Sequence, residues 1–198
     1  EGVVGLHGKL IKRSIISQNN LSFEEELKFL EDEVFMFDIL AFTRSMKYVR
    51  KQLYTYNINS NQNVKSARTE SFVRPFPISY FKLMKDHAEN SFRQRGFSDE
   101  ESEKLGDQAF IYWIIFTLVL RSLSIAKGKM NLEEGIKYRK KLIDDLTTNS
   151  DISKSIRNYS PSREESRWIP RALAWRSSKL LKFMLDRRVK EILRREVS

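Results

Sequence analysis

Cysteine is absent from this chain of 198 residues, and histidine occurs only at His7 and His87. Without cysteine the chain forms no disulfide and supplies no thiolate nucleophile. Two histidines are too few for the cysteine and histidine ligand sets of structural zinc sites. A metal bound to this chain would therefore be a hard cation held by oxygen ligands.

The sequence also lacks the features of a secretory signal and of a long membrane span. Residues 1–5 contain neither an initiator methionine nor the basic start of a signal peptide, so we expect an internal piece of a longer protein. The apolar block at residues 109–120 is well short of the roughly 20 residues that cross a bilayer. We expect a buried helix there, with a membrane-inserted hairpin as the alternative.

Apolar residues make up 40% of the chain, and phenylalanine alone occurs 13 times. This composition excludes disorder driven by low hydrophobicity for most of the length. The length suits one domain, or one domain with an appendage.

The net charge of +10 is unevenly distributed along the chain. Residues 151–198 hold 13 basic and 6 acidic side chains, a net charge of +7 in the last quarter. A basic C-terminal segment predicts an anionic partner, which could be lipid headgroups, nucleic acid or an acidic face of the protein itself.

Hydrophobic periodicity and turn residues predict a mainly helical chain with a small β part. We expect extended or strand structure at residues 3–11 and 46–58, a turn at 14–20 and a loop at 59–68. A capping-box spacing from Ser22 to Glu25 predicts a helix from about Phe23. Further helices are expected at residues 31–44, 72–95, 98–121, 131–146 and 168–196, with a polar connector at 147–162.

Three segments follow one another in an order that suggests a function. They are Lys9-Leu10-Ile11-Lys12-Arg13, then Phe29-Leu30-Glu31-Asp32-Glu33-Val34-Phe35, then Leu53-Tyr54-Thr55-Tyr56. This order resembles the second, acceptor-side half of the catalytic domain of bacterial family 2 glycosyltransferases, which have the GT-A architecture. The resemblance covers roughly residues 3–60. It implies the C-terminal portion of a GT-A-like α/β domain at residues 1–60, followed by a helical appendage at residues 61–198.

The resemblance implies that Asp32 is the general base and that Glu31 orients the acceptor or a neighbouring side chain. An inverting transfer needs one carboxylate beside the acceptor hydroxyl, which loses its proton as it attacks the activated sugar. Acidic residues in a first helical turn are also common for capping alone, because they interact favourably with the helix dipole. Glu33 is expected to be solvated.

The resemblance also implies that Lys9, Lys12 and Arg13 lie near the acceptor and near the diphosphate of a sugar nucleotide, where cations stabilise the leaving group. A basic segment facing water is the alternative. His7 stands where many members of the family carry tryptophan, and it is expected to contact substrate or to be a structural histidine.

The nucleotide-binding half of such an enzyme has no counterpart in this sequence. An early Pro-x-Tyr-Asn segment, an Asp-Asp-Gly-Ser turn and an Asp-x-Asp metal motif are all missing. The expected Mn or Mg ion would therefore take its ligands from a preceding segment. By resemblance, the activity is transfer of a sugar from a nucleotide-sugar donor to a glycan or lipid-linked acceptor in surface polysaccharide synthesis.

The expected C-terminal helix combines a broad apolar surface with many basic residues. It either docks on the rest of the domain or lies in a membrane interface, with Trp168 and Trp175 at headgroup depth. The alternative function is thus a non-catalytic helical module that binds an anionic membrane surface or an acidic partner. Nucleic acid is disfavoured, because no recognisable binding motif accompanies the charge. A cytoplasmic protein, peripheral at the inner face of the membrane, fits both functions.

Overall fold

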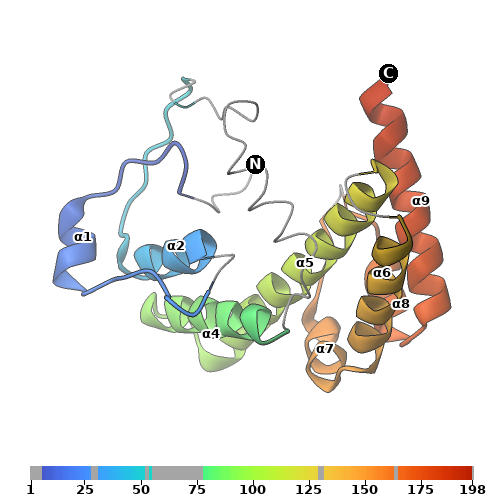
Figure 1. Ribbon diagram of the computed structural model, residues 1–198. Helices are drawn as coiled ribbons and strands as arrows, with labels where there is room; N and C mark the ends of the chain where they lie inside the picture. The colour runs from blue at the N-terminus through green and yellow to red at the C-terminus, as the bar shows by residue number, and fades with distance from the viewer. Residues whose placement is uncertain are drawn as a thin grey trace. The chain divides into compact units, whose positions relative to one another are not determined.

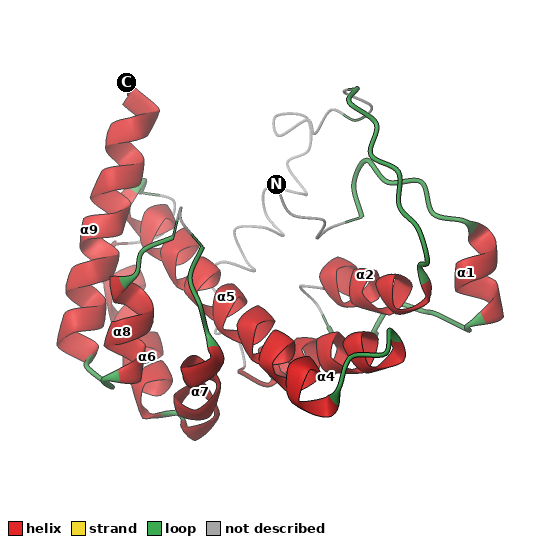
Figure 2. Cartoon of the chain, turned by 180° about the vertical axis from the view of Figure 1, so that it is seen from behind, coloured by secondary structure: helices red, strands yellow, loops and turns green. Residues whose placement is uncertain are grey.

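The computed structural model describes residues 6–27, 31–51, 54, 78–128, 132–162 and 165–197, and this part of the chain is mainly helical (Figures 1 and 2). No strand occurs within these ranges. The elements are α1 (Arg13–Gln18), α2 (Glu31–Phe42), α4 (Ile78–Gln94), α5 (Asp99–Ala126), α6 (Leu132–Thr148), α7 (Ser150–Ser155), the 3₁₀ helix η1 (Ile156–Asn158), α8 (Trp168–Ala174) and α9 (Ser178–Val197). The mainly helical class is thus confirmed.

The two expected strands are not found where the structure describes them. Residues 6–12 form a turn and irregular chain, and α1 then replaces the expected turn at 14–20. Gly8 has a φ of 69°, which a strand does not accommodate. Residues 46–51 are irregular and exposed, so their alternating side chains have no sheet face to cover. The remainder of both expected strands, apart from Tyr54, lies outside the described residues.

The helix expected from about Phe23 is also wrong within residues 22–27, which contain only a turn. The Phe23 ring instead stacks on Phe35 of α2, with 4.3 Å between the ring centroids. Helix α2 itself is confirmed, although it ends at Phe42 rather than Arg44. Thr43 stops it, because its hydroxyl donates to the Ile39 carbonyl at 2.7 Å.

The chain divides into two compact units. Unit 1 comprises Glu1–Val64 and Ile78–Gly106, and unit 2 comprises Lys65–Pro77 and Asp107–Ser198. In unit 1, α2 packs on α4 (Figure 1). Their buried apolar residues are Val34, Phe35, Met36, Ile39, Phe81, Met84 and Ala88. The expected domain division at residue 60 stays a prediction, because residues 55–77 lie outside the described part.

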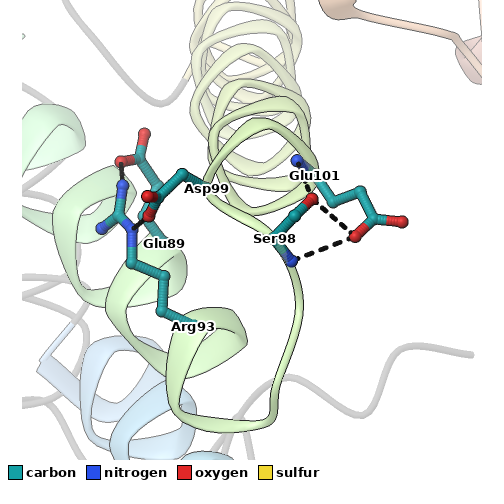
Figure 3. Close-up of polar contacts among 5 residues, drawn as sticks. All are labelled: Glu89, Arg93, Ser98, Asp99 and Glu101. Carbon is teal, nitrogen blue, oxygen red and sulfur yellow. Dashed lines mark hydrogen bonds and ion pairs between the residues drawn. The ribbon is translucent and has the colours of Figure 1, made fainter.

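The turn from α4 into α5 follows the sequence signals closely (Figure 3). Gly96, with a φ of 89°, ends α4, and the Phe97 N–H donates to the Phe92 carbonyl at 3.2 Å. Ser98 and Glu101 then form a reciprocal capping box: the Ser98 N–H donates to the Glu101 carboxylate at 3.0 Å, and the Glu101 N–H donates to the Ser98 hydroxyl at 3.3 Å. The predicted start of this helix is confirmed.

Helix α5 continues past Arg121, where we expected it to end. Arg121 is only 1% exposed, and its guanidinium donates to the Tyr138 hydroxyl of α6. This polar contact offsets part of the cost of burying the cation, and the helix continues past it to Ala126. Among the described helices, α5 alone is long and apolar enough to cross a membrane by length and composition, but 56% of its apolar window is buried inside the protein. That burial agrees with the expected buried helix.

The expected polar connector at 147–162 contains α7 and η1. Asn149 caps α7, because its side-chain oxygen accepts from the N–H groups of Asp151 and Ile152 at 2.9 and 3.1 Å. Ile152 and Ile156 are buried and anchor the segment in unit 2. Ile152 and Ile156 are four positions apart, as in a helix, but the polar residues around them make the segment look like a connector in the sequence.

The single helix expected at 168–196 is two helices, α8 and α9, with a sharp break between them. The Ser177 N–H donates to the Ala172 carbonyl and the Arg176 N–H donates to the Leu173 carbonyl, both at 3.0 Å. This pair of bonds is a Schellman motif, and Arg176 takes the left-handed conformation that the motif requires, with a φ of 52°. The Ser177 hydroxyl then accepts from the Leu180 N–H at 3.3 Å and caps α9. Pro170 lies in the first turn of α8, as predicted.

Unit 2 buries the larger apolar core around these helices. Its side chains that are at most 1% exposed are Phe110, Ile111, Ile114, Leu118, Ile152, Ile169, Leu173, Leu181 and Leu185. All three tryptophans of the chain, at positions 113, 168 and 175, also belong to this unit.

Candidate functional site

The acidic start of α2 is the part of the predicted site with the most distinctive chemistry. Glu31, Asp32 and Glu33 form the first turn of the helix, and all three are partly exposed. One oxygen of the Asp32 carboxylate accepts from the Glu33 N–H at 3.1 Å, which orients the side chain at the helix terminus. The positive end of the helix dipole favours negative charge at this position.

Glu33 is not the solvated residue that we expected from the sequence. Burial, together with a smaller effect of the adjacent Asp32 side chain, raises the pKa of Glu33 to about 8. At neutral pH the Glu33 carboxyl therefore keeps its proton. A carboxyl group with a strongly raised pKa is typical of sites that perform acid–base chemistry and also occurs in structural clusters.

His7 and Gly8, just before the first of the three segments, lie close to Tyr54 of the third segment. The His7 ring lies against the Tyr54 ring with 5.2 Å between centroids and an angle of 51°. At Gly8, a side chain would meet the Tyr54 Cβ at 3.8 Å, so the two stretches of backbone are close together. His7 thus has an aromatic neighbour, which favours its structural role.

The same N-terminal segment also packs on α2. Leu6 and Ile11 contact the buried cluster of Phe35, Met36 and Ile39. All three segments of the resemblance therefore have described residues in unit 1. Ile11 of the first segment contacts the cluster that includes Phe35 of the second, and His7, two residues before the first segment, contacts Tyr54 of the third. The sequence order alone did not require this proximity.

The three predicted cations differ in their surroundings. Lys9 is partly buried, whereas Lys12 and Arg13 are exposed at the start of α1. Within the described residues, the side chains of Lys12 and Arg13 take part in no ion pair, and no hydrogen bond joins them to Asp32 or Glu31. They are available to an anionic ligand.

Sequence reasoning missed an ion pair between α2 and α4. His87 Nδ1 lies 2.8 Å from Asp38 Oδ1, and both side chains are largely buried. The hydrogen bond to Asp38 raises the pKa of His87. The two residues are 49 positions apart, so no local pattern could have revealed the pair. Its location between packed helices indicates a structural role.

Arg95 makes a second polar link between the same elements. Its Nη1 donates to the Leu40 carbonyl at 2.9 Å, which satisfies one of the carbonyls that the end of α2 leaves free. The ion pair and this cap hold α2 on α4, and they thereby fix the helix that carries the acidic turn.

No group of three or more His, Cys, Asp or Glu side chains suited to hold a metal is found in the part of the chain that the structure describes. The Mn or Mg ion expected from the resemblance therefore has no ligand set among these residues. Its proposed ligands in a preceding segment stay a prediction.

A second surface with functional character is the outer face of α9. Within the described residues, five exposed cations of this helix have no ion-pair partner: Lys179, Lys182, Arg187, Lys190 and Arg194. Phe183 lies among them with 60% of its surface exposed, and Trp175, just before the helix, is 62% exposed. The apolar stripe of Leu181, Leu185 and Val189 faces the interior instead. We call the five cations with Phe183 the basic face of α9.

Comparisons of the chain with protein-family models, with curated proteins and with solved structures gave no match.

Proposed function

We propose that this chain is the acceptor-side part of an enzyme similar to the family 2 glycosyltransferases, with Asp32 as general base and Glu31 orienting the acceptor. The proposal rests on the sequence resemblance together with the acidic turn of α2. Asp32 is partly exposed, is held by the Glu33 N–H and lies beside a carboxyl that keeps its proton.

In the proposed reaction the acceptor hydroxyl attacks the anomeric carbon of a nucleotide sugar. As the new C–O bond forms, the bond from that carbon to the diphosphate oxygen breaks, and the hydroxyl proton passes to the Asp32 carboxylate. Glu33 is protonated at neutral pH and therefore competes poorly for this proton. One carboxylate at the acidic turn then accepts the proton while its neighbour stays neutral.

The leaving diphosphate needs positive charge, and Lys12 and Arg13 are the exposed candidates in this chain. No step is assigned to a metal, because the described residues offer no ligand set for one. The nucleotide-sugar donor, the glycan or lipid-linked acceptor and the role in surface polysaccharide synthesis belong to the same proposal.

Substitution of Asp32 by Asn in the complete enzyme tests the assignment. The amide cannot accept the proton, so turnover should fall by about a hundredfold or more, while the far-UV circular dichroism stays unchanged. Asp145→Asn, at an exposed position of α6, is the matched control and should retain normal turnover. Near-normal turnover of the Asp32→Asn protein would rule out Asp32 as base.

The basic face of α9 favours a second candidate function, in which the chain binds an anionic membrane surface. Cations near such a surface contribute about 1 kcal/mol each, and exposed aromatic side chains suit the headgroup region. Phe183 and Trp175 are such side chains. This function requires no catalysis and is compatible with the first.

Co-sedimentation with vesicles that contain phosphatidylserine tests this second function. Replacement of Lys179, Lys182 and Lys190 by Gln should reduce binding at low salt about tenfold or more, because three attractive charges are removed. The same change at three exposed lysines of α6, Lys137, Lys140 and Lys141, is the control for net charge. Equal losses in both triple variants would show that overall charge, and not the basic face of α9, attracts the vesicle.

A further inference from the structure

A hollow of about 350 Å³ opens at the surface of unit 2, between the end of η1 and one side of α8. It is lined by Ile156, Tyr159, Ser160, Pro161, Arg167, Pro170, Arg171 and Ala174. All of these residues belong to unit 2, so the hollow is separate from the acidic turn of α2 in unit 1.

The rim of the hollow is held in place by side chains of α5. Gln108 binds the backbone of Ser160 twice: its amide nitrogen donates to the Ser160 carbonyl at 2.7 Å, and its amide oxygen accepts from the Ser160 N–H at 2.8 Å. Asn158 donates to the Asp107 carboxylate at 2.7 Å. The hollow is therefore formed by ordered chain and needs no rearrangement to exist.

Beside its polar groups the hollow has an apolar part, which we call the floor. Ile156, Tyr159 and Pro170 are buried and present carbon surface, and Pro161 and Ala174 extend this surface toward the rim. An apolar group placed here would be removed from water, which contributes about 0.8 kcal/mol for each buried methylene group.

Two arginines on α8 bring positive charge to the same hollow. Arg167 and Arg171 are four residues apart and lie on one side of the helix, and neither forms an ion pair with a described residue. The Arg171 guanidinium lies over the Trp168 ring at 4.9 Å, a contact that restricts its orientation. Each guanidinium offers a fork of donors that matches phosphate oxygens.

Glu165, two positions before Arg167, accepts from the Tyr159 hydroxyl at 2.8 Å and from the Ser162 N–H at 2.6 Å. Neither arginine forms an ion pair with this carboxylate or with another described acid, so both can contact an anion that comes from outside the chain.

We propose that this hollow binds a phosphate group that carries an apolar chain, with Arg167 and Arg171 holding the phosphate and the floor holding the first part of the chain. Guanidinium forks alone would bind any phosphate. The apolar floor beside them selects an amphiphile, in which both groups are covalently joined. The site is independent of the proposed transfer reaction and of the basic face of α9.

Isothermal titration calorimetry with a short-chain phosphatidic acid, kept below its micelle concentration, tests the proposal on the 198-residue chain. The Arg167→Gln, Arg171→Gln double variant should bind this probe at least about tenfold more weakly, because the charge-assisted hydrogen bonds are lost. The double variant Arg44→Gln, Arg50→Gln makes the same change at two exposed positions of unit 1 and should bind normally. Equal weakening in the two variants, or no binding to the parent chain, would overturn the proposal.

Inorganic phosphate, titrated in the same way, separates the two parts of the ligand. It should bind much more weakly than the amphiphile, since it gains nothing from the floor. Ala174→Leu fills part of the hollow without changing the charge, and it should weaken only the amphiphile. If phosphate binds the parent chain as tightly as the amphiphile, or if Ala174→Leu changes neither affinity, the apolar chain has no place in the site and the proposal fails in that form. Unchanged far-UV circular dichroism of each variant is required for these comparisons.

Discussion

The two units of this protein place charge inside the fold in different ways. In unit 1, the charge between α2 and α4 is paired, since Asp38 and His87 meet at 2.8 Å. In unit 2, the most deeply buried charged side chains are Arg121 and Asp107, which are 1% and 3% exposed. Burial lowers the pKa of Arg121 to about 10 and its guanidinium donates to the Tyr138 hydroxyl, while the Asp107 carboxylate accepts from Asn158 at 2.7 Å. Unit 1 therefore sets opposite charges against each other in a partly exposed position, whereas the charges of unit 2 are nearly fully buried and carry a larger desolvation cost.

The two units also differ in the charged side chains on their surfaces. Among the described carboxyl groups, Glu33 in the acidic turn of α2 has the most strongly shifted pKa. Among the described helix faces, the basic face of α9 carries the most exposed cations. The lesson is a partial separation of roles: the carboxyl group with the strongly raised pKa lies in unit 1, together with the exposed Lys12 and Arg13, and the larger set of exposed cations lies in unit 2. The larger apolar core also lies in unit 2, which predicts where truncation is most costly.

The largest expected effect on stability is therefore the truncation of Leu181 in unit 2. This side chain is 0% exposed, and Leu181→Ala should lower the free energy of unfolding by about 2–5 kcal/mol. Urea denaturation followed by tryptophan fluorescence measures it, because all three tryptophans lie in unit 2. Phe183→Ala, on the exposed side of the same helix, is the control and should stay within about 0.5 kcal/mol of the parent. A small effect at Leu181 would mean that α9 is not packed on this unit.

Much of the helical structure could be predicted because its signals are local. The start of α5 needed only Ser98, Glu101 and the glycine before them, and α2 needed only its acidic first turn and its apolar repeat. The two expected strands failed because a strand requires partners elsewhere in the chain. Tyrosine and valine at residues 46–51 suit a sheet, but the described part of the chain contains no strand that could lie beside this stretch.

The candidate site was predictable to a similar extent. The position of Asp32 in a first helical turn follows from the sequence, and so does its chemistry as a carboxylate. Burial of Glu33 and the pairing of Asp38 with His87 do not, because both depend on packing between segments that are far apart in the chain. The acid–base character of the site is therefore visible only after folding.

A second, smaller effect follows from the raised pKa of Glu33. In the unfolded chain this carboxyl titrates near 4.5 and in the folded chain at about 8, so the folded state retains a proton that the unfolded state has lost. The stabilisation is complete below pH 4.5 and is lost as the pH rises through 8. Glu33→Gln removes this dependence, and the stability gap between pH 5 and pH 9 should shrink by about 1–2 kcal/mol, a value reduced for partial exposure.

Urea denaturation of unit 1, followed by far-UV circular dichroism at the two pH values, measures this change. The His87–Asp38 pair also loses stabilisation as the pH rises, because the pKa of His87 is raised. The difference between parent and variant isolates Glu33 from that contribution. Glu26→Gln, at an exposed position, should leave the gap unchanged. An unchanged gap in Glu33→Gln would show that this carboxyl is solvated after all, as the sequence suggested.

The break between α8 and α9 is the correction that the sequence could least anticipate. Apolar periodicity runs through residues 168–196 without interruption, and the residue in the left-handed conformation is an arginine rather than the glycine that usually marks such an end. Arg176 is kept there partly by a hydrogen bond that its Nε donates to the Ser153 hydroxyl at 2.9 Å. Because Ser153 is 23 positions away, this stabilisation has no local signature.

The smallest expected effect is a difference in stability between two variants of Arg176, and its sign tests whether the chain breaks between α8 and α9. Arg176→Gly and Arg176→Ala both lose the hydrogen bond to Ser153, but only alanine retains a Cβ in the left-handed conformation. The glycine variant should therefore be more stable than the alanine variant by up to about 1 kcal/mol, as measured by urea denaturation with tryptophan fluorescence. In a continuous helix the order is reversed, because glycine is less favourable than alanine by about 1 kcal/mol in a helix interior. The order of these two variants thus decides between a single terminal helix and two helices joined at Arg176.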